Sequence, residues 1–203
     1  MPRPPKISRD EVLEAALQIV DQHGLKALSM RRLGDALGVE AMSLYHHVEG
    51  KEAVLDGVHE AVLRRLRPPP PTGCWRDDVR ALALALAEVL GAHPHALPLF
   101  ATRAAVTPGS LHLVEHGLRV LAEPFPELPR RVAALQAVVS WVIGQQLVSL
   151  SAPETLDYAA LSPEAFPLLV EVGCSGALAT HEEVFIFGLD ALLRGLRPQA
   201  PGG

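Results

Sequence analysis

Aromatic residues are scarce in this sequence. They make up 4% of its 203 positions, although hydrophobic residues together make up 49%. Alanine, leucine and valine therefore supply most of the apolar side chains. This composition favours helices packed on helices over β-sandwiches. The length suits one large domain or two small ones, with enough material for a core.

Cysteine is also scarce. Cys74 and Cys174 have no partner motif, and we interpret them as reduced thiols in a cytoplasmic protein. The N-terminus is charged and interrupted by prolines, unlike a signal peptide. The most apolar stretch, residues 132–150, contains two serines and three glutamines, which favours a buried core helix over a membrane span. We therefore expect no membrane partner.

Common catalytic motifs are missing too. The sequence contains no G-x-S-x-G, no P-loop, no H-E-x-x-H and no paired Cys-x-x-Cys. Its serines and histidines show no spacing that would place a nucleophile beside its base. We expect neither an enzyme nor a bound cofactor. The alternative that stays open is a helical enzyme or small-molecule carrier whose first 67 residues bind a protein partner.

An excess of positive charge is absent as well, since the net charge is −5. Its distribution is uneven. Residues 1–67 contain ten basic and ten acidic side chains, and residues 68–203 contain eight and thirteen. All three lysines, Lys6, Lys26 and Lys51, lie in the first part. Cationic side chains there would be able to meet phosphate, although a solvated face gives the same pattern.

Four consecutive prolines within residues 67–73 divide the chain. They end any helix and form a stiff connection, so we expect one domain over residues 7–67 and another over residues 68–203. Before the prolines the pattern predicts four helices. Ser8 and Glu11 form a capping box at the start of the first helix, and Gly24 ends it.

The next helices are short. Ser29 caps the second helix, Gly38 follows it where a turn needs a left-handed residue, and a third helix covers about residues 40–47. Gly50 precedes the fourth. Two short helices joined by a three- or four-residue turn with glycine form a helix-turn-helix, here over about residues 29–48. Gly34 and Gly38 would let its helices cross closely.

The part after the prolines is apolar along five predicted helices. Wide leucine, valine and alanine stripes place them over residues 75–92, 110–122, 128–151, 163–179 and 181–196.

Residues 38–58, "GVEAMSLYHHVEGKEAVLDGV", closely resemble the recognition-helix region of the tetracycline-repressor (TetR) family. Three later stretches also resemble that family: "GCWRDDVRALALALAEVLGAHP" its long fifth helix, "LFATR" its Leu-Gly-Thr-Arg stretch and "EVFIFGLDALLRGL" its last helix. The resemblance covers about residues 7–197. It implies an all-α fold of about nine or ten helices, with an N-terminal three-helix DNA-binding domain and a larger helical domain for ligand binding and dimerisation.

The resemblance implies roles for eight residues in binding double-stranded operator DNA. Arg31 would read a guanine edge, side chains early in the third helix would meet bases or thymine methyl groups, and those that follow would hold phosphates and nearby edges. The set is Arg31, Ala41, Met42, Ser43, Tyr45, His46, His47 and Lys51.

The resemblance does not extend to the drug. The positions that match the tetracycline pocket carry Arg64, Leu82, Leu86, Leu99, Gly117 and Val148, and only Arg103 keeps its type. Mg²⁺ needs hard oxygen ligands, so we exclude tetracycline–Mg as the effector. We expect an unidentified small molecule in an apolar cavity. Its candidate lining residues are Leu82, Leu86, Phe100, Arg103, Leu113, His116, Leu135, Val139, Trp141 and Gln145.

Two further features keep alternatives open. Arg103 would meet an anionic or carbonyl group of the ligand, or would form a salt bridge. His112 and His116 stand four residues apart, with His93 and His95 nearby in sequence. That spacing would suit a metal-sensing regulator, but no cysteine joins them and we expect no metal site.

The family arrangement implies a homodimer in which residues 128–151 and 181–196 of two copies form a four-helix bundle. The expected interface residues are Leu135, Val142, Phe185, Leu189, Leu192 and Leu193. The function implied is that of a repressor, released from a palindromic operator when a small apolar or amphipathic molecule shifts the population of two arrangements.

Overall fold

The computed structural model describes residues 7–150, 157–176 and 178–198. All regular structure in these ranges is helical, which confirms the expected all-α fold. The α-helices are α1 (Arg9–His23), α2 (Met30–Leu37), α3 (Ala41–Leu44), α4 (Lys51–Leu63), α5 (Trp75–Ala92), α6 (Leu97–Thr102), α7 (Pro108–Val120), α8 (Leu128–Ser149), α9 (Pro167–Ser175) and α10 (His181–Gly195). Three short 3-10 helices accompany them: η1 (Leu25–Ala27), η2 (Pro94–Ala96) and η3 (Tyr158–Ala160).

Helix α1 begins and ends where the sequence predicts. The Ser8 side chain accepts a hydrogen bond from the Glu11 amide at 3.2 Å, and the Ser8 amide donates to the Glu11 carboxylate at 2.7 Å. These two bonds satisfy amides that the first turn leaves without helical partners. Gly24 ends the helix at a φ of 76°.

The helix-turn-helix is confirmed, but its recognition helix, α3, is shorter than the predicted residues 40–47. Ser29 caps α2 by accepting from the Arg32 amide at 3.2 Å, and Gly38 takes a left-handed φ of 68°. Only Ala41–Leu44 is α-helical, and turns continue through His47. The two glycines play different parts. A Cβ on Gly34 would lie 2.7 Å from the Val39 carbonyl oxygen, whereas one on Gly38 meets nothing within 4 Å.

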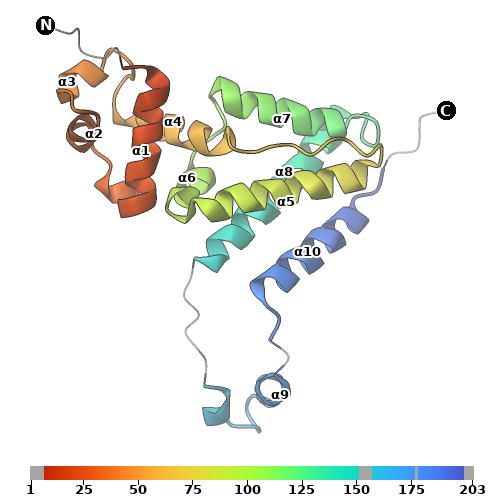
Figure 1. The fold of residues 1–203 in the computed structure, drawn as a ribbon. Coiled ribbons are helices and arrows are strands. Elements are labelled where there is room, and N and C mark those ends of the chain that lie inside the picture. Colours follow the sequence, from red (N-terminus) through yellow and green to blue (C-terminus); the bar gives the residue numbers. More distant parts are fainter. Residues whose placement is uncertain (1–6, 151–156, 177, 199–203) are drawn as a thin grey trace, which may run out of the picture.

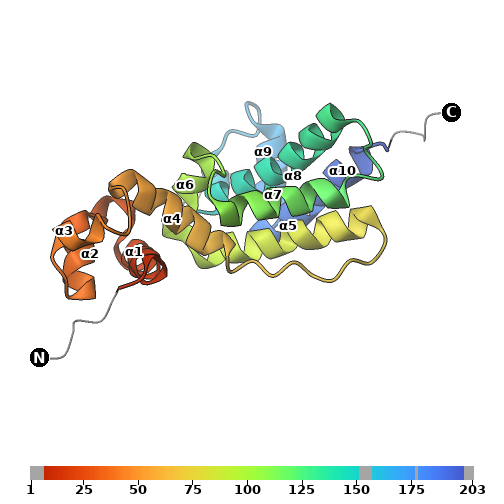
Figure 2. The same ribbon diagram turned by 90° about the horizontal axis from the view of Figure 1, so that it is seen from above.

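Helix α4 joins the two halves of the molecule (Figure 1). It packs along α1, and the contact is close at Gly57, where an added Cβ would lie 2.1 Å from a methyl group of Leu13. The proline-rich connection follows in extended form, and α5 then runs beside α7, α8 and α10. Figure 2 shows α1–α3 at one end and this bundle at the other.

The second half differs from the prediction in its details. Helix α5 has the predicted bounds, but α9 starts at Pro167 rather than near residue 163, and η2 and α6 were not predicted. Pro94 and Pro98 each occupy the first turn of a helix, where the missing proline amide would have had no partner.

Helix α8 has the length and apolar composition of a membrane span. In this fold it packs against α5, α6, α7 and α10. Helix α9 lies apart from these helices, beside η3 (Figure 1). Cys74 and Cys174 are free and exposed.

Replacing Gly34 with alanine is expected to destabilise the helix-turn-helix. The new methyl group would meet backbone atoms of Val39 and Ala41, which cannot rotate away, so we expect the free energy of unfolding to fall by about 1–3 kcal/mol. Urea unfolding of both proteins measures this. The matched control is Gly144→Ala on α8, where a Cβ meets nothing within 4 Å and helix propensity should add up to about 1 kcal/mol. Equal stability of the two variants would contradict the prediction.

Candidate functional site

The eight residues expected to meet DNA lie together around α2, α3 and the start of α4. Met42 is 73% exposed and Tyr45 is 50% exposed. Arg31, Ser43, His46 and Lys51 are also exposed, and Ala41 and His47 are partly buried. Leu33, Leu44 and Val48 are buried beneath them and hold this surface on the core of the first domain.

The start of α4 adds backbone donors to the same surface. Gly50, at a φ of 99°, precedes the helix, and no side chain caps it. The Tyr45 ring lies beside this point, because its Cε1 atom would be 3.9 Å from a Cβ on Gly50. A helix N-terminus with free amides and a neighbouring lysine favours an anionic group such as phosphate.

The second site is a cavity of about 230 Å³ enclosed by α4, α5, α6, α7 and α8. Its wall is almost entirely apolar. Seven of the ten predicted lining residues contribute to it: Leu82, Leu86, Phe100, Arg103, Leu113, Leu135 and Val139. Leu82, Leu86 and Gly117, three of the positions that match the tetracycline pocket, also line it, so that part of the wall offers no polar side chain.

Three predicted lining residues lie elsewhere. The Trp141 indole packs on α10, where it would leave no room for a Cβ on Gly188, and its Nε1 donates to the Phe185 carbonyl at 3.3 Å. His116 on α7 and Gln145 on α8 are partly buried outside the cavity wall. Helical spacing indicates which side of a helix a residue lies on. It does not show whether that side faces the cavity or another helix.

The contribution of α4 to the cavity was not predicted from the sequence. His59 and Leu63 of α4, and Leu66 just after it, line the cavity. His59 is 5% exposed, and its ring stacks on Phe100 with centroids 4.2 Å apart.

In the sequence His59 stands beside Glu60 and three residues after Asp56, which suggests a solvated face. Only the neighbouring apolar residues Val58 and Val62 indicated a buried one.

Arg103 forms ion pairs with Glu52 and Asp56 of α4. Of the two roles considered for Arg103, the structure contains the salt bridge. These ion pairs join the end of α6 to α4. Both carboxylates therefore compete with any anionic group that would approach the guanidinium from the cavity.

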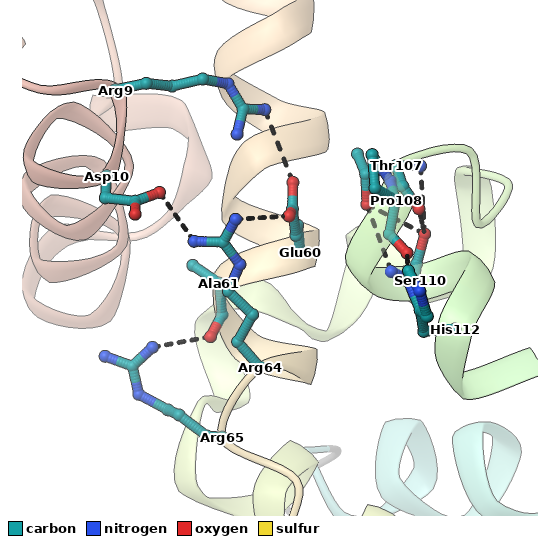
Figure 3. A network of polar contacts seen from close by, with 10 residues as sticks. All are labelled: Arg9, Asp10, Glu60, Ala61, Arg64, Arg65, Thr107, Pro108, Ser110 and His112. Atoms are coloured by element: carbon teal, nitrogen blue, oxygen red, sulfur yellow. Dashed lines mark hydrogen bonds and ion pairs between the residues drawn. The ribbon is translucent and has the colours of Figure 1, made fainter. Parts of the chain in front are cut away.

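A second polar network holds α4 to α1 (Figure 3). Glu60 is 2% exposed and pairs with Arg64 at 2.7 Å and with Arg9 at 3.5 Å. Arg64 also pairs with Asp10 at 2.7 Å, which lowers the pKa of the Asp10 carboxyl group. Arg64, another position that matches the tetracycline pocket, thus serves this network. Glu60 also approaches α7, because a Cβ on Gly109 would lie 3.1 Å from its Oε1 atom.

The predicted interface residues lie mostly inside the protomer. Val142, Phe185, Leu189 and Leu193 are buried, Leu192 is partly buried, and Leu135 lines the cavity. The reason is that α10 packs against α5 and α8 of its own chain. Among the large apolar side chains that α8 and α10 expose are Val148, Val184 and Phe187.

Three of the four histidines considered for metal binding contact other groups. The Nδ1 atom of His93 lies 2.9 Å from the Asp21 carboxylate, that of His95 lies 2.8 Å from the Asp21 carbonyl oxygen, and that of His112 lies 2.6 Å from the Pro108 carbonyl oxygen. Within the described ranges no three histidine, cysteine or acidic side chains form a group suited to a metal ion.

A helix-turn-helix beside a helical domain with an apolar cavity defines a ligand-responsive DNA-binding regulator. Comparison with known proteins agrees with this class. Residues 12–58 match the family "Bacterial regulatory proteins, tetR family", and residues 67–200 match "Tetracyclin repressor-like, C-terminal domain". The chain therefore belongs to the TetR family of bacterial transcriptional regulators.

Individual relatives cover most of the chain. An HTH-type transcriptional regulator of Saccharopolyspora erythraea is 38% identical over 141 residues, or 69% of this chain and 60% of that protein, which is less than two thirds of its length. The HTH-type transcriptional repressor DrrR1 of Streptomyces coeruleorubidus is 31% identical over 95% of this chain and 78% of its own. The crystal structure of apo ActR from Streptomyces coelicolor has a TM-score of 0.85 at 25% identity and covers 97% of this chain and 96% of its own.

The buried His59 should make stability depend on pH. Burial lowers the pKa of its imidazole below the ordinary value of 6.5, although Asp56 opposes this effect. As the pH falls below about 6.5, the unfolded chain therefore takes up a proton before the folded protein does, and stability is lost. We expect the melting temperature of the wild type to fall more between about pH 7.5 and pH 5.5 than that of His59→Phe. Parallel melting curves in the two proteins would contradict this.

Proposed function

We propose that this protein is a repressor that binds a palindromic operator as a homodimer and releases it when a small apolar or amphipathic molecule fills the cavity. One observation carries the proposal: α4 forms part of the cavity wall and also packs against α1, which in turn contacts α2 of the helix-turn-helix. Ligand binding in the cavity and DNA binding by the first domain would therefore both involve α4. We place the protein in the cytoplasm and expect no enzymatic activity.

The DNA contacts follow from exposure and chemistry. In this proposal Ala41, Met42 and Ser43 meet base edges in the major groove, and Arg31 pairs with a guanine. Tyr45, His46, His47 and Lys51 hold the phosphate backbone together with the amides of α4. Two copies would present these surfaces about 34–36 Å apart, which matches one turn of DNA.

Ligand binding would act through the contacts that hold α4. Arg103 joins α4 to the end of α6, and His59 stacks on Phe100 of the same helix. A molecule between these helices would favour an arrangement of α4 in which the two recognition helices no longer match the operator. The loss of DNA affinity equals the difference between the ligand's affinities for the two arrangements.

The apolar wall supports an effector other than tetracycline–Mg. Leu82, Leu86 and Gly117 offer no hard oxygen ligand for Mg²⁺. ActR, a TetR-family protein of similar structure, has been crystallised with actinorhodin, which is another class of molecule. ActR is 26% identical to this chain, and its structure matches with a TM-score of 0.82.

A homodimer would cover the apolar surface that α8, α9 and α10 expose. Phe187 is 73% exposed, and only 17% of the most apolar window of α8 is buried in the protomer. The arm formed by η3 and α9 exposes Phe166, Leu168 and Leu169 as well. Apolar surface of this extent is typical of an interface.

The DNA-binding proposal is tested by selecting genomic fragments on the purified protein and titrating the best fragment by fluorescence anisotropy in about 50 and 200 mM salt. We expect a palindromic site and an affinity that falls steeply with salt, because several phosphates release counterions. Weak binding without an enriched site would contradict the proposal.

Variants separate base reading from phosphate binding. Arg31→Ala should weaken operator binding by about tenfold to a hundredfold and relax the sequence preference at one position. Lys51→Ala should weaken binding to all sequences and reduce the salt slope by about 1. The matched control is Arg119→Ala on α7, which removes an exposed cation away from the DNA surface and outside the helices proposed to form the dimer, and should leave affinity unchanged. If the control loses as much affinity as Arg31→Ala, the assigned surface is wrong.

A charge on the exposed face of α10 should prevent dimerisation. Phe187→Asp would place a carboxylate in an apolar interface, where its desolvation is costly, so we expect monomers in sedimentation velocity at micromolar concentration and weaker operator binding. Val106→Asp introduces the same charge at another exposed apolar side chain and should leave a dimer. If Phe187→Asp sediments as the wild type does, the dimer must use another face.

A further inference from the structure

The cavity wall contains a buried polar side chain whose hydrogen bonds are unsatisfied. His59 is 5% exposed and lines the cavity. Its ring stacks on Phe100, but no hydrogen bond joins either ring nitrogen to any residue in the described part of the chain. Leaving a buried donor and acceptor unpaired is costly. A bound molecule that pairs with the imidazole would remove that cost.

The other polar side chains of the wall already have partners. Arg103 pairs with Glu52 and Asp56. The Ser110 hydroxyl donates to the Thr107 carbonyl at 2.9 Å and accepts from the Thr107 amide at 3.1 Å. Within the described lining, His59 is therefore the polar side chain free to recognise a ligand group.

The electrostatics of the wall disfavour a charged ligand. Glu52 and Asp56 together outweigh the positive charge of Arg103, so an anion gains no net attraction there. A cation would meet the positive Arg103 guanidinium before it reached the carboxylates of Glu52 and Asp56, and the rest of the wall is apolar. A charged group would lose its hydration without replacement.

The state of His59 fits a neutral partner. Burial lowers the pKa of the imidazole, so the ring is neutral near pH 7 and offers one N–H donor and one bare nitrogen acceptor. A hydroxyl group donates to the bare nitrogen or accepts from the N–H, so it suits either tautomer. The flat surface of the stacked His59 and Phe100 rings and the cavity volume of about 230 Å³ suit a compact ring system.

We propose that the effector is an uncharged, largely apolar ring compound with a hydroxyl group, and that His59 selects it by a hydrogen bond to that group. This proposal rests on the proposed function, in which the cavity holds the effector. It names the chemical class of the effector and one specificity-determining residue.

The test uses three probes of one shape: 2-naphthol, 2-methylnaphthalene and 2-naphthoate. Isothermal titration of the full-length protein at about pH 7.5 measures their dissociation constants. We expect 2-naphthol to bind about tenfold more tightly than 2-methylnaphthalene, as one net hydrogen bond provides, and 2-naphthoate to bind more weakly than both. Tightest binding of 2-naphthoate, equal binding of all three, or no binding of any probe would overturn the proposal.

Two variants assign the preference to His59. His59→Phe keeps a ring against Phe100 but removes both polar atoms, so the preference for 2-naphthol should disappear while 2-methylnaphthalene binds as before. His59→Gln keeps a donor and an acceptor and should retain part of the preference. The control His116→Phe lies outside the cavity wall and should bind all probes as the wild type does. Circular dichroism verifies that each variant is folded. An undiminished preference in folded His59→Phe would overturn the proposal.

Operator binding by the same proteins separates this inference from the proposed function. A preference for 2-naphthol that depends on His59 supports the inference whatever the DNA experiment yields. An operator that is bound tightly by a protein without this preference contradicts the inference alone.

Discussion

The packing of α4 on both sides is the constraint on which the rest of this structure depends. Toward the first domain it contacts α1 so closely that Gly57 has no room for a side chain beside Leu13. Toward the second domain it closes the cavity with His59, Leu63 and Leu66. Because protein interiors are densely packed, α4 cannot move relative to one side without changing its contacts on the other. In the proposed function, this shared packing is what would let the contents of the cavity influence the position of the DNA-binding helices.

Ion pairs make the position of α4 specific. Glu60 is buried between Arg9 and Arg64, and Arg103 pairs with two carboxylates of α4 across the domain boundary. Partly exposed ion pairs of this kind contribute little to stability, but a charge as deeply buried as Glu60 is costly to separate from its partners. Such contacts favour a small number of discrete arrangements over a continuous range. In the proposed function, a ligand would change the operator-bound fraction only by as much as its affinities for two such arrangements differ.

The sequence predicted the features that depend on neighbouring residues and failed where distant contacts decide. Local signals located the capping box at Ser8, the turn at Gly38, and both ends of α5. Seven of the ten side chains chosen from helical spacing line the cavity. The spacing could not show that α10 turns Phe185 and Leu189 toward its own core while Phe187 stays exposed, because both faces of that helix are apolar. It gave no sign that Phe100 would bury His59, since α6, which begins with Leu97 and Pro98, was not predicted.

The most direct test of the link between cavity and DNA is the operator affinity of a protein whose cavity is partly filled by its own side chain. Val139 of α8 lines the cavity, and Val139→Phe would add ring carbons to that space without altering the DNA surface. Fluorescence anisotropy with the selected operator gives the dissociation constant, and sedimentation verifies the dimer. The account predicts that the affinity of the folded, dimeric variant falls by about fivefold or more. An unchanged affinity in such a protein would contradict it.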